Sequence, residues 1–195
     1  DQPCWQALRE RVIVRLGGCE VLLGNYGHGE QLLIDSLPRI EEERERAFAL
    51  LYLGQAATER GELALADIYI TQSLEISRQC TSVAGMSQAL HIMQVGRSTA
   101  EAHPLTAESL ALARKAGRPD LIATTLNVLG WHTWCLGDYA LANAQWQEGV
   151  SRCDELGLWG ENAWALDCLG FAAWCQGDMV AAERIDQLRI DPDQL

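Results

Sequence analysis

The sequence predicts an all-α protein, a solenoid of about five antiparallel helix hairpins. The stretch LNVLGWHTWCLGDYALANAQW, residues 126–146, returns forty positions later as LDCLGFAAWCQGDMVAAERID, residues 166–186. A period near forty is typical of stacked helical repeats. Apolar side chains also follow a helical period, because Leu126, Leu129 and Leu136 share one face of a helix. No β-type alternation of useful length competes with this pattern.

Four glycine pairs with one common separation mark the hairpins. They are Gly17 and Gly24, Gly54 and Gly61, Gly130 and Gly137, and Gly170 and Gly177. Seven residues make about two helical turns, so the first glycine lies inside a helix and the second ends it. The acidic or amide residue that follows then begins the next helix. A glycine inside a helix costs about 1 kcal/mol relative to alanine, so we expect close approach by a neighbouring helix. Small residues on the second helix are the expected contacts: Gly29, Ala66, Ala142 and Ala182.

A fifth hairpin with weaker signals is expected between the second and third glycine pairs. Gly96 would take the place of the helical glycine, and residues 101–104, EAHP, would form the turn with proline at the first helical position. The expected helices are 4–23 and 27–37, 39–60 and 62–79, 82–100 and 104–116, 119–136 and 138–156, and 160–176 and 178–190. They form repeats at about 4–37, 39–79, 82–117, 119–157 and 160–190, in one array over residues 1–195.

Composition excludes several classes of function. The net charge is −12 and Lys115 is the only lysine, so no basic stripe is present to contact nucleic acid. Apolar runs are much shorter than the ~20 residues of a membrane span. No phosphate loop, nucleophile elbow or HExxH motif is present, so we expect no catalytic residues and no cofactor.

The seven cysteines are an odd number without a CxxC pair, which favours reduced core residues in a cytoplasmic protein. Cys135, Cys153, Cys168 and Cys175 fall within apolar helical patterns. A thiol cluster formed by Cys135, Cys168 and Cys175 is the alternative, but no metal-ligand spacing accompanies it.

The charge run EEERER, residues 41–46, has two interpretations. It is the solvated start of a helix with opposite-charge pairs inside the run, or it is a surface for a partner. The first interpretation is the expectation.

These repeats resemble the tetratricopeptide repeat family. They are most similar to the long repeats in the sensor arrays of bacterial regulators related to the maltose regulator and to the signal-transduction ATPases with numerous domains (STAND). The segments SLALARKAG, residues 109–117, and residues 126–150 carry the resemblance, which extends over nearly the whole chain. It implies a right-handed α-solenoid. Such repeats serve as scaffolds for many partners, so the fold alone does not name one.

The resemblance also implies a binding site, because the first helices of successive hairpins line the concave surface in this family. The expected ligand-binding groove contains Asn127, Trp131, Trp134, Trp164, Asp167, Phe171, Trp174 and Arg97. Aromatic walls with a few polar groups are typical of ligand pockets. The alternative is that these aromatic residues pack against one another as core. Trp146, on a second helix, is expected to be core.

The function implied by the resemblance is a sensor of a small-molecule or protein effector. The chain begins with Asp1 rather than Met, so we expect a fragment of a larger STAND-type ATPase or transcriptional regulator. Effector binding in the groove would relieve autoinhibition of neighbouring domains. The alternative is a constitutive scaffold that binds a peptide or helix. A third possibility is self-association through uncapped ends, since the last helix carries Ile185, Leu188 and Ile190 without a polar capping helix.

Overall fold

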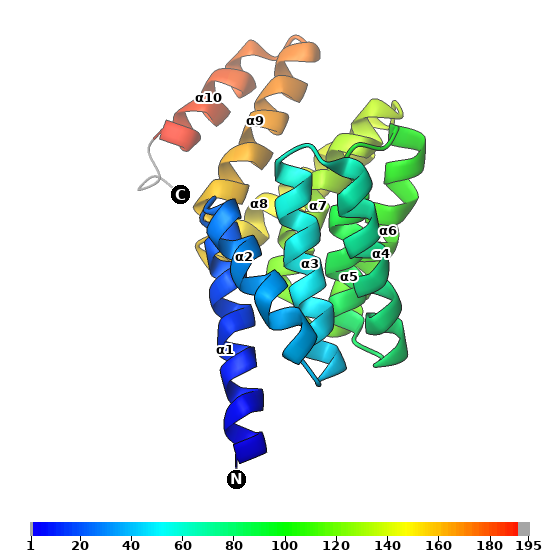
Figure 1. Ribbon diagram of the computed structural model, residues 1–195. Coiled ribbons are helices and arrows are strands. Elements are labelled where there is room, and N and C mark those ends of the chain that lie inside the picture. The colour runs from blue at the N-terminus through cyan, green and yellow to red at the C-terminus, as the bar shows by residue number, and fades with distance from the viewer. Residues whose placement is uncertain (1, 191–195) are drawn as a thin grey trace. The chain divides into compact units, whose positions relative to one another are not determined.

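The computed structural model describes residues 2–190, which are helical except at short turns (Figure 1). The predicted all-α helical repeat fold is confirmed for these residues. The elements are α1 (Gln2–Leu22), α2 (Tyr26–Ser36), η1 (Leu37–Arg39), α3 (Glu43–Glu59), α4 (Leu63–Gln79), α5 (Val83–Met93), α6 (Thr99–Ala116), α7 (Pro119–Cys135), α8 (Tyr139–Leu156), α9 (Trp159–Cys175) and α10 (Met179–Ile190). Two compact units divide the chain between Gly96 and Arg97.

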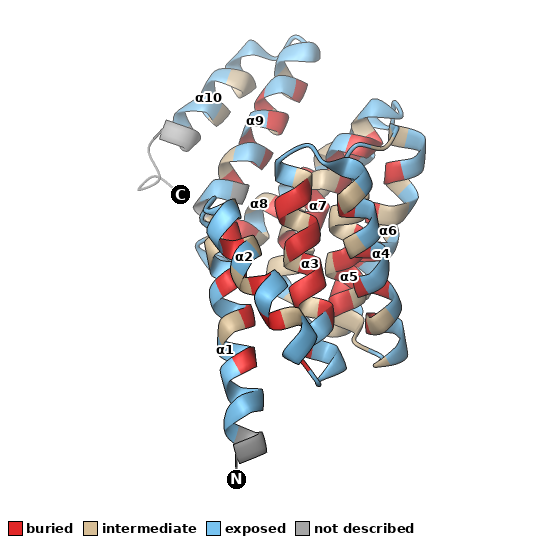
Figure 2. Ribbon diagram, in the orientation of Figure 1, coloured by how far each residue is buried: buried red, intermediate tan, exposed pale blue. Residues whose placement is uncertain are grey.

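The first unit contains α1 to α5, and its core surrounds α3. Helices α1 and α2 pack as one hairpin, α3 and α4 as the next, and α5 packs on both α4 and α3. Buried residues occur along much of α3, as Figure 2 shows. One apolar cluster of this unit joins Val14, Val21, Leu33, Ile40, Ala49, Leu53 and Ala56. Burial of each such leucine or valine side chain stabilises the unit by about 1.5–3 kcal/mol.

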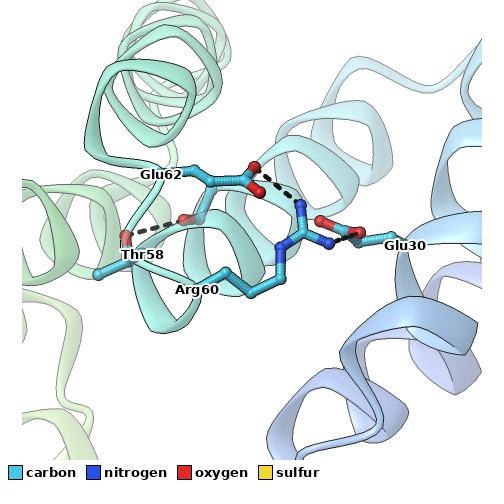
Figure 3. Close-up of polar contacts among 5 residues, drawn as sticks. Glu30, Thr58, Arg60 and Glu62 are labelled. Atoms are coloured by element: carbon cyan, nitrogen blue, oxygen red, sulfur yellow. Dashed lines mark hydrogen bonds and ion pairs between the residues drawn. The ribbon is translucent and has the colours of Figure 1, made fainter.

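An arginine at the end of α3 connects the first two hairpins (Figure 3). The Arg60 guanidinium donates hydrogen bonds to Glu30 of α2 and to Glu62, at 2.9 Å, in the turn before α4. The carboxylate of Glu62, and then that of Glu30, raises the pKa of Arg60. Beside it, the Thr58 hydroxyl donates to the carbonyl oxygen of Gly54, at 2.9 Å. These surface contacts fix the turn, although exposed pairs of this kind contribute only about 0–1 kcal/mol.

The second unit contains α6 to α10, and each of these helices packs on the next one along the chain. Trp146 of α8 is completely buried, so its predicted core position is confirmed. It packs with Ala142 of its own helix and with Cys168 and Ala172 of α9. A second cluster joins α6 to α7 through Leu110, Leu126 and Leu129.

The turn chemistry predicted from the glycine pairs is confirmed. Gly24, Gly61, Gly137 and Gly177 all have positive φ, between 75° and 92°. Asp138 and Asp178 cap the helices that follow, because each carboxylate accepts a backbone N–H three residues later, at 3.1 and 3.0 Å. Asn25 and Glu62 hold the equivalent positions in the first unit without a capping side-chain hydrogen bond.

The close approach of a neighbouring helix is confirmed at three of the helical glycines, but the nearest atoms there belong to large side chains rather than to the expected small residues. A Cβ at these glycines would lie 2.5–2.8 Å from a large side chain sixteen positions later, namely Leu33 over Gly17, Ile70 over Gly54 and Trp146 over Gly130. At Gly17 the expected small partner is also among the nearest atoms, because a Cβ there would be 3.2 Å from the Gly29 carbonyl oxygen. The expected small residue allows the helices to approach, and the large side chain one turn further on fills the space beside the glycine.

Residues 82–104 differ from the prediction. Helix α5 ends at Met93, and Gly96 lies in the following turn with a φ of 77° rather than inside a helix. Helix α6 begins at Thr99, so Pro104 lies inside it. The physical reason is a capping box: the Glu101 carboxylate accepts hydrogen bonds from the Ser98 N–H at 3.1 Å and from its hydroxyl at 2.6 Å. The Ser98 hydrogen bonds also lower the pKa of Glu101.

The charge run 41–46 is a solvent-exposed helix start, as expected, except at Glu45. The helix expected from residue 39 begins at Glu43, after the 3₁₀ turn η1 and an extended Ile40. Glu45 is buried rather than solvated. It pairs with Arg15 and Arg11 of α1, at 3.1 and 3.8 Å, and not with a residue of the run. The packing of α1 on α3 therefore decides the environment of this carboxylate.

Among the described residues, no helix is both long and apolar enough to cross a membrane. The expectation of an uncapped end depends partly on Leu188 and Ile190, and the side chains of these two residues are not among those that the structure describes. Residues 191–195 lie outside the described chain.

Candidate binding surface

A chain of four aromatic rings connects α7, α8 and α9 in the second unit. The Trp134 ring centroid lies 4.4 Å from that of Tyr139 and 6.0 Å from that of Phe171, and Phe171 lies 6.2 Å from Trp174. Trp134 also contacts the buried Trp146, with centroids 5.8 Å apart. Aromatic pairs at such distances contribute about 0.5–1.5 kcal/mol beyond their buried area. Trp134 therefore joins the core to the surface.

Four of the expected groove residues expose much of their aromatic side chains. The exposed fractions are 41% for Trp131, 40% for Trp164, 44% for Phe171 and 58% for Trp174. We call these four residues, together with Trp134, the aromatic surface. It lies on α7 and α9, the first helices of two consecutive hairpins that contact each other. Soluble proteins rarely expose a large apolar patch without a use for it.

Asn127 does not belong to this surface, and its expected role in the groove is wrong. It is 1% exposed. Its backbone carbonyl accepts a hydrogen bond from Trp146 Nε1 at 3.0 Å, and its side-chain Nδ2 lies 3.8 Å from Cys153 Sγ. A Cβ at Gly149 would overlap the Asn127 side chain. Asn127 thus faces α8, where it supports the hairpin.

The two charged residues of the expected groove occupy different places. Asp167 is exposed on α9, beside the aromatic residues of that helix. Arg97 is half-buried in the turn between α5 and α6. The expectation that Arg97 projects from a first helix is wrong, because α5 ends four residues before it.

A hollow of about 470 Å³ lies between α9 and α10. Its lining residues are Gly170, Phe171, Trp174, Met179, Ala182, Glu183 and Asp186. We call it the terminal hollow. It shares Phe171 and Trp174 with the aromatic surface, and it adds two carboxylates. Aromatic faces next to carboxylates suit an apolar or a cationic group.

The repeat itself explains why this hollow is open. In the hairpin of α7 and α8, the space beside Gly130 is filled by Trp146. Forty residues later the equivalent positions are Gly170 and Asp186, and a Cβ at Gly170 would meet nothing closer than 3.6 Å. Sequence reasoning missed this site, although the exchange of tryptophan for aspartate between equivalent positions was a visible signal.

The cysteines do not form a reactive cluster beside the aromatic surface. Cys168 is buried, whereas Cys135 and Cys175 are exposed, so the expectation of core positions for these two is wrong. Burial, with a smaller contribution from Asp167, raises the pKa of Cys168 to about 12. Its thiol is therefore protonated at neutral pH and a poor nucleophile. In the described part of the chain, no group of three or more His, Cys, Asp or Glu side chains is placed to hold a metal ion.

A scan against models of protein families found no match, and a search of curated proteins also found none. Solved structures share the fold. A Rap protein complexed with Competence and Sporulation Factor matches 94% of this chain with a TM-score of 0.81 and 18% identity. A STAND protein with a tetratricopeptide repeat sensor, from Pyrococcus horikoshii, matches 91% with a TM-score of 0.76 and 17% identity. BtubC from P. vanneervenii matches 96% with a TM-score of 0.76 and 16% identity.

This chain covers a different fraction of the length of each matched structure. The chain spans 54% of the Rap chain, 28% of the STAND chain and 82% of BtubC. At these identities the likeness shows the fold alone. The fold is a tetratricopeptide-like helical repeat array, and its resemblance to the repeats of a STAND sensor is confirmed.

Proposed function

From this tetratricopeptide-like fold and its aromatic surface, we propose that the chain is the effector-sensing domain of a larger signalling protein. The effector contacts the aromatic surface on α7 and α9. Its binding changes how the array meets neighbouring domains of a STAND-type ATPase or transcriptional regulator, and so relieves autoinhibition. The observation that carries the proposal is the exposure of Trp131, Trp164, Phe171 and Trp174 on two helices in contact.

The chemistry of the surface indicates the class of effector. Its aromatic rings favour an apolar or aromatic group, and the terminal hollow has room for one large side chain or a small ligand. The carboxylate of Asp167 lies on α9, and those of Glu183 and Asp186 lie on α10. The net charge of the chain is −12. A neutral or cationic effector therefore fits better than an anion, and nucleic acid is disfavoured.

The matched structures support a binding role without naming the ligand. The Rap protein is in complex with Competence and Sporulation Factor, and the repeats of the STAND protein are described as a sensor. No described cysteine of this chain forms a disulfide, which suits the reducing cytoplasm. We place the protein there as a binding domain without catalytic residues of its own.

The proposed switch sets a requirement on affinity. An effector that converts a 1:99 equilibrium to 99:1 must bind one state about 10⁴-fold more tightly than the other. The aromatic surface must therefore differ between the two states of the full-length protein.

The alternative from a different class is a constitutive scaffold for a peptide or helix. The exposure of aromatic rings on two helices in contact also favours it, because such a surface suits a helix or an extended segment of a partner. A thermal-shift and tryptophan-fluorescence screen separates the two. Small metabolites that shift the signal support a sensor of metabolites, whereas a response to polypeptides that does not alter the output of the full-length protein supports a scaffold.

The direct test uses substitutions on the aromatic surface. Trp131→Ala and Trp174→Ala remove exposed rings, so they should abolish the effector response of the intact protein and leave its helical circular dichroism unchanged. Trp5→Ala is the matched control, because Trp5 is 71% exposed but lies on α1 in the first unit. An unchanged response in the first two variants would exclude the aromatic surface as the site.

A further inference from the structure

Helix α1 has a second apolar face, which remains exposed in the described chain. Val14 and Val21 on its inner side are buried. The opposite side is exposed along the helix, as Figure 2 shows. Apolar side chains at helical spacing form a stripe there, which we call the α1 stripe: Leu8, Val12, Leu16 and Cys19. Val12 is 58% exposed and Leu16 is 47% exposed. A helix that is apolar on two opposite sides is normally covered on both.

The repeat shows what covers this face in other hairpins. Counted from the helical glycines, the residues that correspond to Val12, Leu16 and Cys19 are Ala49, Leu53 and Ala56 in α3, and Ala165, Leu169 and Ala172 in α9. Those in α3 are fully buried, in one cluster with Val21 and Leu33 of the hairpin before them. Ala172 lies in a cluster with Ala142 and Trp146, and Leu169 packs against that cluster. In both cases the preceding hairpin covers this face.

The covering face is repeated, and is free, in the hairpin of α9 and α10. Within the chain, α7 and α8 cover α9 with Trp134, Ala142 and Trp146. Forty residues later the corresponding residues are Trp174, Ala182 and Asp186, and all three line the terminal hollow. Trp174 is 58% exposed. The pattern of the repeat therefore makes the terminal hollow the place where the first helix of another hairpin packs.

Side-chain volume is complementary between the two free faces. Within the chain, the large Trp146 meets the small Ala172. On the free faces the sizes are exchanged: Asp186 replaces Trp146 and leaves a hollow of about 470 Å³, whereas Cys19 replaces Ala172. Val12 likewise replaces Ala165. The α1 stripe thus carries more volume where the hollow has room, which favours close packing of one on the other.

Charge at the two faces is complementary as well. Arg15 holds the position of Cys168, which clusters with Trp146, and Asp186 holds the position of Trp146 itself. Packing of the α1 stripe into the hollow therefore brings Arg15 next to Asp186. The Arg15 side chain is 49% exposed although it pairs with Glu45. Because a guanidinium has five N–H donors, it can bind a second carboxylate without leaving the first.

We propose that this chain associates with a second copy of itself, head to tail: the α1 stripe of one copy packs into the terminal hollow of the other. We call this contact the junction. It repeats the way in which α9 packs on α7 and α8 within one chain. The two faces differ, so the contact is heterologous, and each dimer keeps one free face of each kind to which further copies add.

The junction does not rest on the proposed function. Trp131 and Trp164 belong to the aromatic surface but do not line the hollow. Failure of the junction therefore leaves the effector test with Trp131→Ala in force, and failure of the effector test leaves the junction in force.

The first experiment needs no mutation. Sedimentation velocity of the wild-type chain is measured from low micromolar to submillimolar concentrations. The buffer contains about 0.15 M salt, which screens the repulsion between copies of net charge −12. The weight-average sedimentation coefficient should rise with concentration past the value of a dimer. A monomer over the whole range would overturn the proposal and leave both faces to another partner, and a plateau at the dimer would contradict a heterologous contact.

The second experiment separates the two faces. Leu16→Glu places a charge in the α1 stripe, and Trp174→Glu places one at the hollow. Each variant alone should self-associate at least about tenfold more weakly, because burial of an unpaired carboxylate is costly. An equimolar mixture of the two retains one intact stripe and one intact hollow, so it should form a dimer with one copy of each variant and nothing larger.

Ile68→Glu is the matched control for these variants. Ile68 is 54% exposed on α4, which contributes to neither face, so this variant should associate like the wild type. Circular dichroism checks that each variant folds, and the wild-type measurement decides the question where one does not. Unchanged association of either folded variant, or a mixture that stays monomeric, would contradict the junction, as would an equal loss in Ile68→Glu.

Discussion

The indole Nε1 of Trp146 donates a hydrogen bond to the backbone carbonyl of Asn127, 3.0 Å away, across the hairpin of α7 and α8. The same ring lies so close to α7 that a Cβ at Gly130 would be 2.5 Å from Nε1. At the equivalent place in the next hairpin, Gly170 has free space beside it. One repeat position is thus filled and the other open, although the two hairpins have nearly the same sequence pattern.

The contrast predicts opposite effects for one substitution at two equivalent positions. Gly130→Ala should lower the free energy of unfolding by about 1–3 kcal/mol, because the new methyl group displaces the Trp146 ring. Gly170→Ala should leave it unchanged or raise it by up to about 1 kcal/mol, because alanine favours the helix and meets no close atom. Urea unfolding followed by circular dichroism measures both. Equal destabilisation by the two variants would show that the two spaces are equivalent after all.

Thr81 predicts a stabilising substitution. It is the only described residue other than glycine with positive φ, at 52°, and it lies in the turn between α4 and α5. The turns between α6 and α7 and between α8 and α9 have Gly117 and Gly157 in this conformation. A β-branched residue in this region carries a strain of about 1–2 kcal/mol. Thr81→Gly should therefore raise the free energy of unfolding by about 1 kcal/mol in chemical denaturation. As a control, Thr124→Gly inside α7 should lower it by about 0.3–0.5 kcal/mol, since glycine is less favourable than threonine in a helix. A loss of stability in Thr81→Gly would show that the strain is absent.

His91 predicts a loss of stability in mild acid. Desolvation lowers the pKa of His91 from 6.5 to about 4 in the folded protein. As the pH falls, the imidazole is therefore protonated in the unfolded chain before it is protonated in the folded protein. The free energy of unfolding is unaffected above about pH 6.5 and decreases as the pH falls from there toward about 4. Between pH 7.5 and pH 5 the loss should be about 1–2 kcal/mol.

The His91→Gln variant isolates this effect, because burial and the nearby charge of His103 also lower the pKa of His132 in the same direction. Urea unfolding at both pH values should give a smaller loss for His91→Gln than for the wild type. His28→Gln is the control, because the His28 side chain is 63% exposed. Identical pH dependence in wild type and His91→Gln would count against a lowered pKa of His91.

Cysteine labelling should divide the thiols by location. Cys19, Cys135 and Cys175 are exposed and should react rapidly with iodoacetamide at pH 8, whereas the buried Cys153 and Cys168 should react only after unfolding. For Cys168, whose pKa burial raises to about 12, only on the order of one thiol in 10⁴ is ionised at pH 8. Peptide mapping by mass spectrometry reads out each site. Labelling of Cys168 in the native protein at the rate of Cys135 would contradict the described packing.

The hairpin pattern was predictable because its signals are local. Positive φ at Gly24, Gly61, Gly137 and Gly177 is a requirement of the turn itself, and it is visible in the sequence as regular spacing. The error at residues 93–104 has a local cause too. Two signals for a helix start compete here: Pro104, and the capping box of Ser98 and Glu101. The helix begins at the capping box, because its side chains satisfy backbone N–H groups at the earlier position.

The binding surface was predictable only in part. Helical period placed Trp131, Phe171 and Trp174 on first helices, and the structure leaves them exposed. The family resemblance also implied that Asn127 lies in the groove, but that residue faces α8. A helix in isolation has no inside or outside, so the direction of each side chain relative to solvent depends on which neighbour covers which face.

The sequence by itself determined the helix hairpins and most of their turns, because glycine conformation and helical period depend on residues close together in the chain. Only the tertiary structure decided which polar groups are buried. Glu45 is paired with Arg15 from thirty positions earlier, and its second oxygen faces no donor. Asp186 leaves open the space that Trp146 fills in the preceding hairpin. Burial is a property of several helices packed together, and so the two candidate sites emerge only where those helices meet.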